Sequence, residues 1–221
     1  MGQKINPKAF RIGEIFTWTS RWFAGGAEYK DFVIEDVKIR QYLFKKLSPA
    51  GVTQIEIERS INKINIIIHV VRPGMVIGRG GQGMEELKKN CGNIIAAHRK
   101  KSGKLDKKNI IKLELRVEPV KDPYLNAYFV ASQIAEQLAK RLHHKRVVNY
   151  AMEKVITVGA GGIKIILSGR IAGAEISRRE TYKRGAMPLS TIREEIDFAA
   201  VPSLTKSGYI GVKVWICRKK R

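Results

Sequence analysis

The chain has 221 residues, with 42 Lys or Arg against 20 Asp or Glu, so its formal net charge at pH 7 is +22. Such an excess repels itself in a free compact protein, and nucleic acid is the first polyanionic partner that we expect. A hydrophobic content of 44% is ample for the packed cores of one or two domains. No apolar run approaches the roughly 18 residues of a spanning helix, and the N-terminus has no signal-peptide core. We therefore expect a soluble, cytoplasmic protein.

The first 16 residues are polar and basic, and they predict an extended arm that is disordered when free or lies along a partner. Three large aromatic residues follow this arm: Trp18, Trp22 and Phe23. We interpret them chiefly as packing or protein-contact residues, because such residues dominate cores and interfaces. Stacking on nucleic-acid bases stays open as the alternative.

The spacing of apolar residues predicts the next elements. Residues 28–47 have helical spacing and lead to a stop at Pro49. We expect the early carboxylates of this helix to form a solvated face that suits the helix dipole, namely Asp31, Glu35 and Asp36. Three stretches alternate as strands do: residues 52–59, 63–71 and 110–118.

A glycine-rich loop lies between the second of these strands and an expected helix over residues 84–90. Its core, Gly78-Arg79-Gly80-Gly81, has the G-x-x-G spacing with which a KH module grips the backbone of single-stranded RNA. Glycines let two backbones approach closely, N–H groups at a helix N-terminus meet phosphate oxygens, and Arg79 adds a positive charge. The order of the predicted elements around this loop is that of a type II KH domain.

Two other interpretations of this loop stay open at this point. Gly78, Gly80 and Gly83 also have the G-x-G-x-x-G spacing of a dinucleotide-binding loop, although residues 72–77 separate the strand from the first glycine. The acidic residue that such a motif needs about 20 positions later falls in a Lys/Arg run. The second alternative is a glycine-rich turn that binds no ligand.

A basic run over residues 99–108 separates the expected helix from the last strand of this domain. Alone it would be interpreted as a solvated loop, but in a chain with a net charge of +22 a phosphate-facing role is about equally supported. We therefore include Lys100 and Lys101 among the candidate RNA-binding residues.

A second domain begins after Pro119 and Pro123. It opens with an amphipathic helix over residues 126–142 and a shorter helix over residues 147–156, and a glycine turn follows at residues 159–162. Three further strands are predicted over residues 163–167, 196–200 and 209–217. The segment after the first of them is rich in guanidinium groups and poor in bulky apolar residues, the profile of a surface that contacts an RNA backbone. From it we select Arg170, Arg178, Arg179, Lys183 and Arg184.

The search for catalytic and metal-binding residues finds none. Cys91 and Cys217 are far apart and lack His at a zinc-binding spacing, so we interpret them as reduced packing residues. The four histidines form no triad-like set, and no P-loop or nucleophile-elbow motif occurs. We predict no catalytic residue, no metal and no cofactor. A nuclease or lyase is the alternative from the enzyme class, and it lacks a carboxylate cluster for a metal.

Segments at both ends of the chain go beyond a general KH pattern. In the first half they are Met1-Gly2-Gln3-Lys4, residues 18–23, Ile34-Glu35-Asp36 and Ile39-Arg40. In the second half they are Ser168-Gly169-Arg170, Gly173-Ala174-Glu175-Ile176, Pro188-Leu189-Ser190-Thr191, Ile196-Asp197-Phe198 and residues 208–216. These segments resemble the family of the bacterial small-subunit ribosomal protein S-three (S3), and the resemblance covers nearly the whole chain.

The resemblance implies a structural protein in the head of the small ribosomal subunit, beside the channel through which messenger RNA enters. The partners that it implies are small-subunit ribosomal RNA, messenger RNA and the neighbouring ribosomal proteins S-ten, S-fourteen, S-four and S-five. A free KH-type regulator that binds messengers outside the ribosome is the alternative.

The predicted fold class is α+β: an N-terminal type II KH domain is followed by a second α+β domain with a mostly antiparallel sheet. We predict these boundaries: a basic arm over 1–16, the KH domain over 17–120, the second domain over 121–217 and a basic tail over 218–221.

One stretch departs from the family pattern. The family usually carries a basic Arg-Arg-Ala-Met-Lys segment linked to messenger unwinding, and the matching stretch here is Asn149-Tyr150-Ala151-Met152-Glu153. Because the positive charges are absent at the matched positions, the resemblance does not carry an unwinding role to this chain. Nearby cations can compensate, and we include them among the RNA-binding candidates: Lys145, Arg146 and Lys154.

Overall fold

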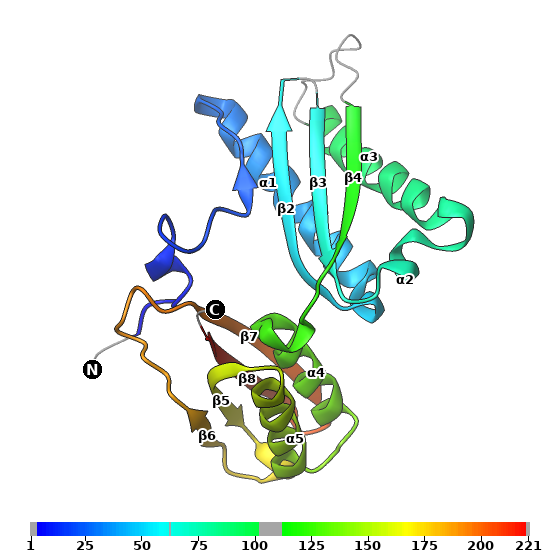
Figure 1. Cartoon of the computed structure of the whole chain (residues 1–221). Helices are drawn as coiled ribbons and strands as arrows, with labels where there is room; N and C mark the ends of the chain where they lie inside the picture. The colour runs from blue at the N-terminus through cyan, green and yellow to red at the C-terminus, as the bar shows by residue number, and fades with distance from the viewer. Residues whose placement is uncertain (1–3, 62, 102–111, 220–221) are drawn as a thin grey trace. The chain divides into compact units, whose positions relative to one another are not determined.

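The chain divides into two compact units (Figure 1). The computed structural model describes residues 4–61, 63–101 and 112–219. One unit consists of Trp18–Lys121, and the other combines Met1–Thr17 with Asp122–Arg221. Over the described residues, each unit has a four-stranded sheet and a hydrophobic core of its own.

The unit over Trp18–Lys121 has the element order that the sequence predicts for a type II KH domain. The elements are β1 (Ser20–Arg21), α1 (Gly26–Lys46), β2 (Val52–Ser60), β3 (Lys63–Val70), α2 (Pro73–Ile77), α3 (Gln82–Lys101) and β4 (Lys112–Pro119). The sheet order is β1-β2-β3-β4, with β2 antiparallel and β4 parallel to β3. Parallel neighbours need a crossover connection, and the glycine loop lies within this one, between α2 and α3.

Alternation in β3 decides which face of this sheet is buried. Its buried residues are Ile64, Ile66, Ile68 and Val70, and the residues between them are only partly buried. They form one core with Leu43 of α1, with Leu87 and Cys91 of α3, and with other apolar residues of the unit. A one-residue slip of β3 would move all four to the other face, so burial specifies the register.

The middle of α1 carries buried charges where the sequence predicts a solvated face. Glu35 and Asp36 are 0% and 2% exposed, and Arg59 of β2 donates hydrogen bonds to both carboxylates. Trp22 donates its indole N–H to Asp36 at 2.9 Å and packs its ring against Phe32. The prediction of solvated carboxylates was wrong for these two residues, because helical spacing does not reveal an arginine that reaches them from a strand.

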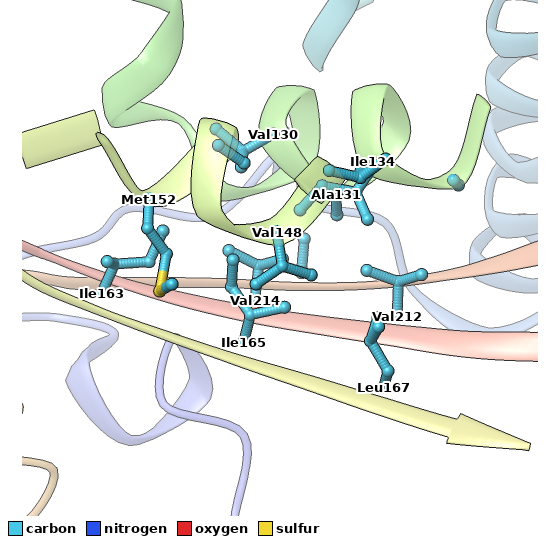
Figure 2. Close-up of a cluster of buried hydrophobic side chains, with 14 of the residues drawn as sticks. Val130, Ala131, Ile134, Val148, Met152, Ile163, Ile165, Leu167, Val212 and Val214 are labelled. Atoms are coloured by element: carbon cyan, nitrogen blue, oxygen red, sulfur yellow. The ribbon is translucent and has the colours of Figure 1, made fainter. Parts of the chain in front are cut away.

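The other unit covers one face of an antiparallel sheet with two helices. Its main elements are α4 (Ala127–Ala139), α5 (His144–Thr157), β5 (Ala160–Gly169), β6 (Arg178–Gly185), β7 (Ile196–Thr205) and β8 (Gly208–Arg218). The strand order is β6-β5-β8-β7, and every pairing is antiparallel. Figure 2 shows Val130 and Ile134 of α4 on the same side of the sheet as Met152 of α5, packed over Ile165 and Val214.

The beginning of α4 is fixed by hydrogen bonds to its first N–H groups. The Asn126 side chain accepts from the backbone N–H groups of Tyr128 and Phe129, as a helix N-cap does. Ala127 donates its N–H to the buried carboxylate of Asp197 at 2.7 Å, and Lys8 forms an ion pair with that carboxylate. Asp197 therefore joins α4, β7 and the N-terminal segment.

The described N-terminal residues do not form a free arm. Arg11 is 1% exposed, and its guanidinium donates to the carbonyl oxygens of Leu189, Thr191 and Glu194 at 2.7–3.0 Å. A buried guanidinium has five N–H groups to satisfy, and main-chain carbonyls supply the acceptors here, three from one loop and a fourth from Pro7. The arm predicted over residues 1–16 is therefore, over its described part, a segment of the second unit. Composition cannot show that one basic residue of such a segment is buried.

Candidate nucleic-acid interface

The glycine loop presents bare backbone between two helices. Gly78 ends α2, and Arg79–Gly81 form a 3-10 turn before α3 begins. Gly80 and Gly81 have φ values of 59° and 82°, which side chains rarely adopt. A Cβ atom at either glycine would meet no atom within 4 Å, so the space beside them is open to a ligand. Arg79 is exposed at the same place.

The helix that follows places its first N–H groups beside the loop. The first N–H groups of an α-helix have no partner within the helix, and the helix dipole favours negative charge at that end. In α3 these groups lie directly after the loop, beside Arg79. Loop, helix end and cation therefore form an arrangement that suits phosphate groups of an RNA backbone.

The first and last glycines of the loop have a packing role. A Cβ atom at Gly83 would lie 2.6 Å from the carbonyl oxygen of Val76, and one at Gly78 would lie 3.1 Å from the N atom of Gly83. These two glycines therefore hold the end of α2 against the start of α3. Because Gly78 follows a helix and not a strand, the dinucleotide-binding interpretation is excluded.

A cleft runs along α3 next to the sheet edge of the same unit. Its volume is about 340 Å³, and it is lined by Met84, Glu85, Lys88, Glu114, Leu115 and Arg116. Met84 and Leu115 offer apolar surface on which a base can lie, while Lys88 and Arg116 supply positive charge. Lys63 forms an ion pair with Glu114 at 2.7 Å, and this hydrogen bond lowers the pKa of the carboxylate. That carboxylate is therefore partly neutralised, which reduces its repulsion of RNA.

Two of the predicted RNA-binding residues cannot be placed by their side chains. Lys100 and Lys101 are the last residues of α3, and their side chains lie outside the described part of the structure. The rest of the basic run, over residues 102–108, also lies outside the described residues.

The arginine-rich segment of the second unit is an edge strand, which the sequence does not predict. Strand β6 pairs only with β5 among the described strands, and all its cations are exposed. Arg179 and Lys183 lie on the sheet face away from α4 and α5, because Tyr182 between them packs on the helix side. Arg178 and Arg184 lie on the helix side, and Arg170 follows β5. The selected cations are thus neighbours along one edge of the sheet, but their side chains lie on its two opposite faces.

A carboxylate limits the contribution of Arg178. Its Nε atom donates to Glu180 at 2.7 Å, and Tyr182 donates its hydroxyl to the same carboxylate. The hydrogen bond from Tyr182 and that from Arg178 hold the pKa of Glu180 below its usual range. Burial and the interaction with Glu180 raise the pKa of Tyr182 to about 12. Glu180 therefore stays ionised and neutralises part of the charge of Arg178.

The exposed side of α5 carries the remaining candidates. Lys145, Arg146 and Lys154 are all exposed. The Lys154 ammonium lies 5.5 Å from the ring centre of Tyr150. Asn149, Tyr150 and Glu153 share this exposed side, whereas Ala151 and Met152 are buried. Asn149, Tyr150 and Glu153, at the positions where the resemblance leads us to expect basic residues, therefore face solvent.

Sequence reasoning missed two cations of the second sheet. Lys164 and Lys213 alternate with the buried residues of β5 and β8, so both point away from α4 and α5. The alternation itself carried the signal, because a charged residue between inward apolar residues of a strand must face outward. The RNA-binding residues predicted for the second domain therefore lacked Lys164 and Lys213.

Neither cysteine is suited to act as a thiolate nucleophile or metal ligand. Burial raises the pKa of the Cys91 thiol to about 11 and also raises the pKa of Cys217, which keeps both protonated. Within the described ranges, no three His, Cys, Asp or Glu residues are grouped so that they can hold a metal ion. The helices formed by the described residues are all too short or too polar to cross a membrane.

The fold and the glycine loop define a two-domain α+β protein of the type II KH class with a basic second domain. A family model described as "KH domain" matches residues 38–125, and one described as "Ribosomal protein S3, C-terminal domain" matches residues 134–216. The chain belongs to the ribosomal protein S3 family.

Relatives agree with this assignment over nearly the full length. The chain is 43% identical over 216 residues to a protein of Desulforamulus reducens, 44% identical to one of Caldicellulosiruptor bescii and 40% identical to one of Clostridium acetobutylicum. Each match covers 98% of this chain and 91% of the relative, and each relative is named "Small ribosomal subunit protein uS3". Members of this family are structural, RNA-binding components and not enzymes, so the nuclease or lyase alternative is excluded.

Proposed function

We propose that the chain is a structural component of the small ribosomal subunit in the cytoplasm. It binds small-subunit ribosomal RNA in the head and helps to form the channel through which messenger RNA enters during translation. Its neighbours there are the ribosomal proteins S-ten, S-fourteen, S-four and S-five. Family membership carries the assignment to the subunit, and the exposed cations of β6 support the contact with ribosomal RNA.

The two units divide the contacts with RNA. In the KH unit, Gly78, Arg79, Gly80 and Gly81 bind the backbone of a single-stranded segment, since the space beside the loop is open. In the second unit, the contacts are made by Arg170, Arg178, Arg179, Lys183 and Arg184 on the edge strand and the turn before it, and by Lys145, Arg146 and Lys154 on α5. The positive charge of these residues neutralises phosphates and releases counterions, so affinity falls steeply with salt.

Sedimentation of a lysate that contains an epitope-tagged copy of the chain tests the proposal. We expect the tagged chain to migrate with small subunits and polysomes at low and at moderate salt. A chain found chiefly at the top of the gradient would contradict the ribosomal assignment and favour the free KH regulator.

A matched pair of variants tests the role of the second unit. Arg170→Gln with Arg184→Gln removes two cations there, and Lys38→Gln with Lys45→Gln removes two exposed cations of α1. We expect the first variant to leave the small subunit at lower salt than the unchanged chain, whereas the second should behave as the unchanged chain does. Equal salt sensitivity of both variants would count against these arginines as RNA contacts.

A further inference from the structure

The face of the second sheet away from α4 and α5 bears a regular array of side chains, part of which is buried in a cluster that includes Met187 and Leu189. Strand register places Lys183, Lys164, Trp215 and Phe198 side by side in one row across the four strands. The next row contains Thr181, Ile166, Lys213 and Ala200. The third row contains Arg179, Ser168, Gly211 and Pro202. Because strands lie about 4.8 Å apart, this face is about 14 Å wide.

The charges of this face all have the same sign. Lys164, Lys183, Lys213 and Arg179 occupy four positions of the three rows, and no carboxylate occupies any position. Arg179, Lys183 and Lys213 are exposed. Glu180 and Asp197 of the same strands point to the helix side, where they bind Tyr182 and the N–H of Ala127. Nothing on the strands therefore neutralises the array.

The array is self-repelling in the free protein. Lys164 and Lys183 lie directly opposite each other on neighbouring strands, an arrangement that destabilises a sheet when the charges are alike. Burial and the nearby charges of Lys4, Lys183 and Arg179 lower the pKa of Lys164. A surface that concentrates like charges in this way matches a polyanion.

The uncharged residues of the face favour binding of the backbone of duplex RNA over stacking of the bases of single-stranded RNA. Trp215 is only 8% exposed, since it forms a buried cluster with Ile166, Ile196 and Cys217, against which Met187, Leu189 and Phe198 pack. The Lys164 ammonium lies 5.4 Å from the ring centre of Trp215. A buried ring cannot provide the stacking platform that single strands use. The exposed residues between the cations are small, namely Thr181, Ala200 and Pro202. The exposed part of the face thus combines cations with small side chains, which suits the wide, shallow minor groove and the phosphates of an RNA duplex.

We propose that this open sheet face, defined by Lys164, Arg179, Lys183 and Lys213, binds the phosphate backbone of double-helical RNA. The inference rests on the proposed function and deepens it, because it assigns duplex RNA to the second unit and leaves single-stranded RNA to the glycine loop. It also adds Lys164 and Lys213 to the cations selected from the sequence.

Binding of two probes to the purified full chain tests the inference. The probes are a blunt RNA duplex of about 20 base pairs, which exceeds the span of about 16 base pairs of a known duplex-binding module, and a uridine single strand with the same number of phosphates. The sheet-face variant carries Lys183→Gln and Lys213→Gln, both at exposed positions. The control variant carries Lys38→Gln and Lys140→Gln, which remove the same charge from exposed positions of α1 and the end of α4.

We expect the sheet-face variant to bind the duplex about tenfold more weakly or worse at low salt. Its plot of log affinity against log salt should be less steep by nearly two, since each phosphate contact contributes roughly 0.9 to the slope. The control variant should keep the affinity and slope of the unchanged chain. Thermal unfolding should show no loss of stability, because removal of two repelling charges relieves the sheet.

Three results would overturn the inference: unchanged duplex affinity of the sheet-face variant, an equal loss in the control, or a loss confined to the single-stranded probe. Failure of the inference is distinguishable from failure of the proposed function, since sedimentation of the unchanged chain with small subunits reports only the latter.

Discussion

Arg59 donates from its Nη1 atom to the Oε2 atom of Glu35 at 2.6 Å, and both side chains are almost fully buried. Arg59 also binds Asp36, and Arg99 of α3 reaches Glu35 at 3.0 Å. The network thus connects α1, β2 and α3 of the KH unit. Each charge in it is compensated only while its partners are present.

We predict that Arg59→Met destabilises the KH unit by about 3–5 kcal/mol, because it leaves two buried carboxylates without their main partner. Urea unfolding of the full chain, followed by the fluorescence of Trp22, measures the loss of unfolding free energy. Lys46→Met is the control, since Lys46 pairs with Glu86 on an exposed surface and should hardly change the urea midpoint. A similar midpoint for both variants would show that the buried network contributes little.

Two glycines of α3 should respond to alanine in opposite directions. Gly83→Ala places a Cβ atom 2.6 Å from the Val76 carbonyl oxygen and should destabilise the unit by about 1–3 kcal/mol through overpacking. Gly92→Ala meets no atom within 4 Å in the same helix and should stabilise it by roughly 0.5–1 kcal/mol. Thermal unfolding of both variants measures the sign of each change in stability. Two changes of the same sign would contradict the close approach of α2 and α3.

The glycine loop should lose affinity for RNA when it becomes acidic. Arg79→Asp with Gly80→Asp should weaken binding of a short single strand by about tenfold or more, because negative charge replaces a phosphate contact. Asp tolerates the left-handed backbone at Gly80, whose φ is 59°, so the fold should persist. Lys30→Asp with Gln41→Asp changes the charge equally on exposed positions of α1 and serves as the control. Unchanged affinity in the loop variant would leave the loop as a turn without a ligand.

Acid should destabilise the second unit through His144. This residue is 4% exposed at the start of α5, and burial lowers its pKa. Glu180, 3.1 Å away, opposes that shift, while His143, Arg178 and Lys145 add to it. A lowered pKa in the folded state means that the unfolded chain binds more protons. The contribution of His144 is therefore complete above pH 6.5, its usual pKa, and is lost as the pH falls toward the lower folded value.

The variant His144→Gln isolates this contribution. The difference in unfolding free energy between the unchanged chain and the variant should shrink as the pH falls below about 6.5, the unfolded pKa of His. Urea unfolding at a series of pH values measures it. A difference that stays constant over this range would show that His144 does not titrate with folding.

Strong periodicity made the cores of both units predictable. Strand β3 alternates buried and partly buried residues along its length, and β2 does so from Gln54 to Glu58. Helix α4 repeats its apolar residues at helical spacing, so the types of these elements follow from sequence. Strand β6 was not predicted, because an edge strand that is exposed along its length lacks this signal. Its pairing with β5 supplies the stabilisation that its side chains do not.

The candidate site was predictable only where it depends on backbone chemistry. The spacing of Gly78 and Gly81 placed the loop correctly between two helices, because glycine is needed where φ is positive. Spacing cannot assign cations to faces before strand register is known, so Arg178 and Arg179 were selected together although they lie on opposite faces. The burial of Arg11 was also beyond prediction, since Leu189, Thr191 and Glu194, three of its acceptors, lie 178–183 residues away in the chain.

That separation has a consequence for synthesis of the chain. The KH unit, Trp18–Lys121, is continuous and emerges complete before any strand of the other sheet exists. The other unit waits for β8, a central strand that pairs with both β5 and β7 and follows them in sequence. Because domains generally fold as units while synthesis proceeds from the N-terminus, the KH unit can fold first. Until β8 is made, Arg11 lacks the fixed acceptors that Leu189, Thr191 and Glu194 supply, and the basic sheet face does not exist. The nascent chain thus acquires its glycine loop well before its second surface for RNA.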